Sequence, residues 1–111
     1  MNDQSGTSSI FELSLSGAFD AAEVDKLRAD LDYLTSSHHD CIVLALHNVD
    51  FMDSSGIGAI VFLYKRLSTR GRSLRLCGVQ GQPLKFLRYL RIDHILDIEP
   101  LAAPVGALQE S

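Results

Sequence analysis

Residues 41–67, CIVLALHNVDFMDSSGIGAIVFLYKRL, place a strand, a tight turn and a helix in immediate succession. Residues 41–52 form an apolar run typical of a buried strand, and residues 57–67 have the pattern of a helix. Asp53-Ser54-Ser55-Gly56 forms the turn between them. The first turn of a helix has backbone N–H groups without intrahelical partners and carries partial positive charge. A serine at this point can carry a phosphate, so Ser54 and Ser55 are candidates for a switch.

The segment before residues 41–67, which we call the strand–turn–helix unit, has the pattern of a strand followed by a helix. Alternating apolar residues predict a strand over residues 10–15, which Gly17 ends. Asp20 has the position of a helix N-cap, and Glu23 follows three residues later as in a capping box. Apolar residues at spacings of three and four then predict an amphipathic helix of about four turns (Val24, Leu27, Leu31 and Leu34). We expect a loop over residues 36–40.

The segment after the unit continues the alternation of strands and helices. Gly71 ends the helix, and residues 73–79 predict another strand. Pro83 can start a short helix, because its missing N–H would be unpaired in the first turn anyway. The remaining expected elements are a helix over residues 84–90, a strand over residues 94–98 and a terminal helix over residues 101–108.

This order of elements predicts a single α/β domain with a mostly parallel sheet. We assign residues 10–111 to the domain and residues 1–9 to a flexible arm or a short edge strand. Residues 41–46 are apolar without alternation, which predicts a strand covered on both faces. If the first two strands are adjacent, the turns at residues 17–20 and 53–56 lie side by side. Asp20, Asp53, Ser54 and Ser55 would then form one acidic and hydroxyl-bearing patch.

The composition restricts the class of function. The chain has 111 residues, 46% of them hydrophobic, which suits one domain with one core. Its net charge of −4 does not suit a nucleic acid or an anionic membrane as partner. No stretch approaches the roughly 20 apolar residues of a membrane span, and residues 1–9 lack the apolar region of a signal peptide, so we expect a cytoplasmic protein. Cys41 and Cys77 lie in apolar runs and are expected to be buried thiols.

Two segments resemble motifs of a known family. LSGAFD, residues 15–20, is similar to the Leu-x-Gly-x-x-Asp turn of the STAS domain family, and FMDSSGIG, residues 51–58, closely resembles the phosphorylation segment of its bacterial anti-sigma factor antagonists. The resemblance implies a mixed, mostly parallel sheet of about four to five strands with about four helices. The family usually has two strands before the first long helix, whereas this sequence predicts one.

The resemblance also implies a function. In the family the serine directly after the aspartate is phosphorylated, which by position is Ser54. The implied partners are an anti-sigma factor that is also a serine kinase of the HATPase type, and a PP2C-type phosphatase. The kinase binds the unphosphorylated form, and the resemblance implies no enzymatic activity, metal or cofactor for this chain. The implied docking face consists of Gly17, Ala18, Asp20, Asp53, Ser54, Ser55 and Gly56.

Phe62 lies away from the apolar stripe of the helix that follows the serines. That stripe should pack on the sheet and consists of Ile57, Ile60, Val61, Tyr64 and Leu67. Two interpretations of Phe62 are open: it fills a groove against the first helix, or it is an exposed anchor for a docking partner.

The sequence gives only weak support for a catalytic site, a metal site or a nucleotide site. A serine nucleophile lacks the Gly-x-Ser-x-Gly elbow, and none of the four histidines has a predictable approach to Ser54. His38-His39-Asp40 lacks the spacing of a metal site, so we interpret it as a loop. The arginines at positions 66, 70, 72 and 75 are interpreted as a solvated face rather than a nucleotide site. Two other classes of function remain open: a non-switching STAS subunit of a lipid-transport or stressosome-like assembly, and a small-molecule or nucleotide-binding module.

Overall fold

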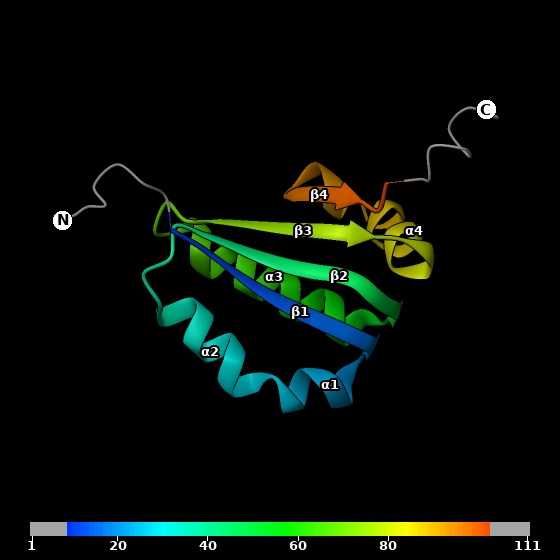
Figure 1. The fold of residues 1–111 in the computed structure, drawn as a ribbon, viewed down its shortest axis with the longest axis horizontal. Coiled ribbons are helices and arrows are strands. Elements are labelled where there is room, and N and C mark those ends of the chain that lie inside the picture. The colour runs from blue at the N-terminus through cyan, green and yellow to red at the C-terminus, as the bar shows by residue number, and fades with distance from the viewer. Residues whose placement is uncertain (1–8, 103–111) are drawn as a thin grey trace.

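The computed structural model describes residues 9–102, and Figure 1 shows a sheet with helices along one face. The described part of the chain contains four parallel strands in the order β1-β2-β3-β4. They are β1 (Ile10–Phe19), β2 (Cys41–Met52), β3 (Ser73–Val79) and β4 (Asp97–Pro100). The α/β fold with a mostly parallel sheet is therefore confirmed, and the described part of the sheet is parallel throughout.

Within residues 9–102, five helical segments connect or follow the strands. They are α1 (Ala21–Lys26), α2 (Arg28–Ser36), α3 (Ser54–Ser68), α4 (Gly81–Tyr89) and the 3₁₀ turn η1 (Ile92–His94). Helices α1, α2 and α3 lie on the same face of the sheet (Figure 1). Each strand lies beside the one that precedes it in sequence, so the sheet grows in a single direction. Because crossovers between parallel strands are right-handed, the helices that connect such strands lie on the same side of the sheet.

The core fills the space between the sheet and these helices. Among the described residues, no polar or charged side chain is buried. The largest fully buried side chains include Phe19, Leu34, Ile42, Leu44, Leu46, Met52, Ile60, Leu63, Leu67, Leu76 and Leu87. Leu63 belongs to the buried stripe of α3 although the predicted stripe omitted it, whereas Val61 and Tyr64 are half-buried.

The prediction that residues 41–46 are covered on both faces is wrong. Ile42 and Leu44 are buried against the helices, whereas on the other face Ala45 is buried but Cys41 and Val43 are only half-buried. Neighbouring strands on both sides shield these short side chains in part, so a central strand can be apolar throughout without a second layer of helices.

Several predicted boundaries also differ. The first strand continues through Gly17 to Phe19, because register shifts after Ser14 and Gly17 absorb the irregular backbone. The predicted four-turn helix is broken at Leu27, which separates α1 from α2. The strand expected over residues 94–98 begins at Asp97, after the 3₁₀ turn.

The other predicted boundaries lie within about three residues of those in the structure. The strand over residues 73–79 matches β3, α3 starts at Ser54, and α4 begins at Gly81 rather than at residue 84. The predicted arm of residues 1–9 lies outside the described residues except for Ser9, and the predicted helix over residues 101–108 lies almost wholly outside them. None of the described helices has the length and apolar character needed to cross a membrane.

Candidate functional site at two adjacent helix starts

Ser54 is the first residue of α3 and is exposed. Asp53 precedes it as the N-cap, and its Oδ1 atom accepts hydrogen bonds from the backbone N–H groups of Ser55 at 2.9 Å and Gly56 at 3.1 Å. These bonds satisfy two of the amides that a helix start leaves without partners. The predicted turn is thus an N-capped helix start that presents the Ser54 side chain to solvent.

The turn between β1 and α1 lies beside this helix start. Phe19 at the end of β1 is the register partner of Met52 at the end of β2, and the Asp53 N–H donates to the Phe19 carbonyl at 3.4 Å. Asp20 caps α1, because its Oδ1 atom accepts from the Glu23 N–H at 3.0 Å. The prediction that the two turns are neighbours is confirmed.

Gly56 allows the start of α3 to lie close to the end of β1, because it has no side chain. It is buried, and a Cβ atom there would overlap the Phe19 carbonyl oxygen and lie 2.9 Å from the Phe19 ring atom Cδ2. A side chain at this position would push α3 away from the end of β1. The position of Ser54 relative to the first strand therefore depends on a glycine.

The predicted docking residues differ in their exposure. Gly17, Ala18 and Ser54 are exposed, whereas Asp20, Asp53 and Ser55 are half-buried by their places at the helix starts. We call these six residues the serine face. Sequence reasoning missed Phe51, which is 45% exposed and is the register partner of Ala18. The signal was present, because polar residues at positions 47, 48 and 50 show that this part of the strand has solvent-exposed positions between its buried ones.

A model of the STAS domain matches residues 3–104. This chain belongs to the STAS domain family. An anti-sigma F factor antagonist of Paenibacillus polymyxa is 38% identical to it over 66 residues, which are 59% of this chain and 56% of that protein. The chain therefore matches little more than half the length of that relative.

Solved structures share the fold of this STAS domain. A Thermotoga maritima protein assigned as an anti-sigma factor antagonist has a TM-score of 0.75 at 20% identity, over 91% of this chain and 85% of that one. A sulfate transporter family protein of Wolinella succinogenes has a TM-score of 0.70 at 20% identity, over 83% and 78%. The Bacillus cell fate determinant SpoIIAA in its phosphorylated form has a TM-score of 0.65 at 19% identity, over 95% and 93%.

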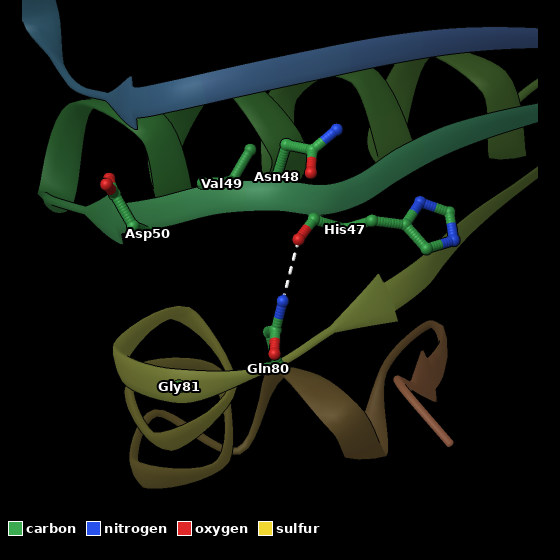
Figure 2. A pocket seen from close by; sticks show the side chains of 6 residues that line it. All are labelled: His47, Asn48, Val49, Asp50, Gln80 and Gly81. Atoms are coloured by element: carbon green, nitrogen blue, oxygen red, sulfur yellow. Dashed lines mark hydrogen bonds between the residues drawn. The ribbon is translucent and has the colours of Figure 1, made fainter. Parts of the chain in front are cut away.

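A gap opens on the other side of β2 in this STAS domain. The pairing of β2 with β3 ends at Ala45 and Cys77, and β2 then continues with β1 as its only strand neighbour among the described residues. A cavity of about 220 Å³ follows, lined by His47, Asn48, Val49, Asp50, Gln80 and Gly81. Figure 2 shows the Gln80 side chain reaching across this gap to the His47 carbonyl, where its Nε2 atom donates at 2.7 Å.

Gln82 closes the far end of the same gap. Its Oε1 atom accepts from the Met52 N–H at 2.8 Å, and its Nε2 atom donates to the Met52 carbonyl at 2.9 Å. One carboxamide thus replaces both ladder bonds that a neighbouring strand would supply. The two glutamines tie the start of α4 to the strand that leads into Ser54.

Phe62 is 49% exposed and lines a hollow between α3 and the helices α1 and α2. The guanidinium carbon of Arg66 lies 4.9 Å from the centroid of its ring, within the range of a cation–π contact. Both interpretations of Phe62 keep a structural basis, because the ring contacts a groove and also remains accessible.

The other residues weighed from the sequence have structural surroundings of their own. His39 stacks on Phe11 with ring centroids 5.0 Å apart, and its Nδ1 atom is 2.8 Å from the Ser9 hydroxyl. Within residues 9–102, no group of three or more His, Cys, Asp or Glu side chains is placed to hold a metal ion. Cys41 and Cys77 are free and half-buried rather than fully buried, and burial raises the pKa of the Cys77 thiol.

The predicted basic face is divided by local pairing. Arg72 donates to the carbonyls of Leu34, Thr35 and His39 and to the Ser37 hydroxyl, at 2.6–3.0 Å. Arg75 binds Asp97 at 2.8 Å, and this hydrogen bond raises the pKa of its guanidinium. Arg66 and Arg70 are exposed, so the solvated face is smaller than the sequence suggested.

Proposed function

We propose that this STAS domain is an anti-sigma factor antagonist in a partner-switching system. In its unphosphorylated form it binds an anti-sigma factor that is also a serine kinase of the HATPase type. Phosphorylation of Ser54 releases the complex, and a PP2C-type phosphatase restores the binding form. The domain itself acts in the cytoplasm as a binding protein and kinase substrate, without catalysis, metal or cofactor of its own.

The observation that carries this proposal is the exposed Ser54 at the capped start of α3, beside the Asp20 turn. A kinase can reach an exposed hydroxyl, and a partner that contacts both turns must also contact that hydroxyl. The name of the Paenibacillus relative supports the same role. In the proposed complex Gly17, Ala18, Asp20, Asp53, Ser54, Ser55 and Gly56 form or shape the docking face, with Phe62 as an additional anchor.

Charge explains how phosphorylation would release the partner. A phosphate adds about −1.5 to −2 charges at pH 7 to a face that already contains the carboxylates of Asp20 and Asp53. The start of α3 tolerates negative charge, so the fold should persist while the interface changes. A loss of about 2–5 kcal/mol at the interface weakens binding by roughly 30-fold to several thousandfold.

Substitution of Ser54 tests this proposal. The full chain with Ser54→Ala should retain a kinase that the chain with Ser54→Asp does not, and mass spectrometry of the two captures identifies it. The purified kinase should bind the native chain and Ser54→Ala with similar affinity by calorimetry, and it should phosphorylate the native chain alone. Ser55→Ala is the matched control, because it removes a half-buried neighbouring hydroxyl and should still accept phosphate at Ser54.

One result would overturn the switch: equal affinity of the kinase for the native chain and for the chain phosphorylated at Ser54. Partners retained by every variant would instead favour a constitutive subunit of an assembly. Saturable binding of a nucleotide that a change at Ser54 abolishes would favour a ligand-binding module.

A further inference from the structure

Two hollows lie in series along the seam between α2 and α3. The first, of about 220 Å³, has an apolar floor and is lined by Val24, Arg28, Leu31, Asp32, Ala59 and Phe62. We call it the apolar hollow. The apolar hollow exists because the helix is interrupted at Leu27, between α1 and α2, and because α3 has the small residues Gly58 and Ala59. A Cβ atom at Gly58 would meet nothing within 4 Å, so this side of α3 is open.

The second hollow, of about 230 Å³, is basic and lies one turn further along α3. It is lined by Thr35, Ser36, Arg66, Thr69 and Arg70. The three hydroxyls donate to backbone carbonyls at 2.8–3.0 Å, so the two guanidinium groups supply its charged donors. Arg66 also packs over the Phe62 ring, which joins the basic hollow to the apolar one.

The seam is continuous with the serine face. Ser54 and Phe62 are eight residues apart on one helix, which is about 12 Å along the axis. A partner that buries about 800 Å² on each side can contact both. The carboxylates of Asp20 and Asp53 lie at the serine end of this surface, and Arg66 and Arg70 lie at the other end. Between them, the opposite charges of Arg28 and Asp32 at the apolar hollow offset each other, so the net charge changes from negative to positive along the seam.

We propose that the seam receives a helix of the anti-sigma factor that carries a large aliphatic side chain and, one turn away, an acidic side chain. The aliphatic group enters the apolar hollow against Phe62, and the carboxylate binds Arg66 and Arg70. The charge gradient fixes the direction of the bound helix, with its acidic residue away from Ser54. This inference rests on the proposed function and names the chemistry of the partner at a surface that does not include the phosphorylated serine.

The test uses the full chain and the purified kinase captured with Ser54→Ala. Phe62→Ala removes the wall of the apolar hollow, Ala59→Leu fills it without touching Phe62, and Arg66→Gln removes charge from the basic hollow. Each should weaken kinase binding at least about tenfold, which is typical of a residue at the centre of an interface. The KM for phosphorylation of Ser54 should rise with kcat unchanged, since these residues contribute to docking and not to phosphoryl transfer.

Matched controls lie on α4. Tyr89→Ala removes an aromatic side chain that is 82% exposed, and Arg88→Gln removes an exposed guanidinium from the last turn of that helix. Both should leave kinase affinity within twofold of the native chain. Thermal unfolding of every variant confirms that a loss of binding is not a loss of fold.

The outcomes separate the two proposals. If the native chain binds the kinase in a manner that depends on Ser54 while the seam variants bind equally well, the seam proposal is overturned and the switch stands. If Arg66→Gln alone has no effect, the acidic part of the proposed partner is overturned. A dimer of the free chain that Phe62→Ala dissociates would assign the seam to a second copy instead. If no kinase binds the native chain, both proposals are overturned.

Discussion

Gly56 decides the geometry of the serine face at the scale of a single residue. Gly56→Ala would place a methyl group against the Phe19 carbonyl and ring, and we expect it to destabilise the domain by about 1–3 kcal/mol. Urea unfolding measures this change. Gly58→Ala is the matched control two residues along α3, because its added methyl group meets open space. It should stabilise the helix by about 0.5–1 kcal/mol.

Equal effects of the two substitutions would show that helix propensity, and not the contact with Phe19, sets the requirement at position 56. The proposed switch at Ser54 would depend on the same contact, since it positions Ser54 against the turn that ends at Asp20. We therefore expect Gly56→Ala to be phosphorylated more slowly than Gly58→Ala by the same kinase.

At the scale of the element, Arg72 completes the end of α2. The last carbonyls of a helix have no intrahelical donor, and Arg72 supplies donors to Leu34 and Thr35 from a position 37–38 residues away in sequence. Arg72→Ala should lower the free energy of unfolding by about 2–3 kcal/mol, because a charged donor to several acceptors is lost together.

Arg70→Ala is the control for Arg72, since it removes a nearby exposed guanidinium and should change stability by no more than about 0.5 kcal/mol. Chemical unfolding of the two variants in parallel gives the comparison. Similar losses for both would contradict a capping role and indicate a general effect of positive charge in this region.

At the scale of the whole molecule, the core lies on one side of the sheet. Two adjacent residues of β2 test this directly: Leu44 is 1% exposed on the helix side, whereas Val43 is half-buried on the other side. Leu44→Ala should cost about 2–5 kcal/mol, and Val43→Ala about 1 kcal/mol or less. Comparable costs for the two substitutions would show that the far face of the sheet is covered as fully as the helix side.

Local signals in the sequence predicted the parts of the fold that depend on local chemistry. Asp20 was predicted as an N-cap and caps α1, whereas the helix after Asp53 was predicted from residue 57 and begins three residues earlier, at Ser54. The strand over residues 73–79 follows Gly71, whose positive φ ends the preceding turn, and its limits were predicted as the structure has them. Predicting that the two turns are adjacent required one further assumption, that successive strands pair with each other.

The errors concern features that depend on distant contacts. Leu27 carries no helix-breaking signal, so the division between α1 and α2 could not be predicted from it. The helices cover one face of the sheet because of the order of the strands. The sequence of residues 41–46 carries no information about that order. Arg72 appeared as one of four surface arginines, because its carbonyl partners lie far away in sequence.

Gln82 has a consequence for how the protein behaves at high concentration. Where β2 extends past β3, an open N–H and C=O pair would form an edge to which a strand of another molecule could add, the route by which many sheets aggregate. A single carboxamide occupies both groups of Met52. The side chain therefore blocks strand addition at the margin of the sheet next to Ser54, where the proposed partner would have to reach the serine face without a second copy of the chain adding to the strand.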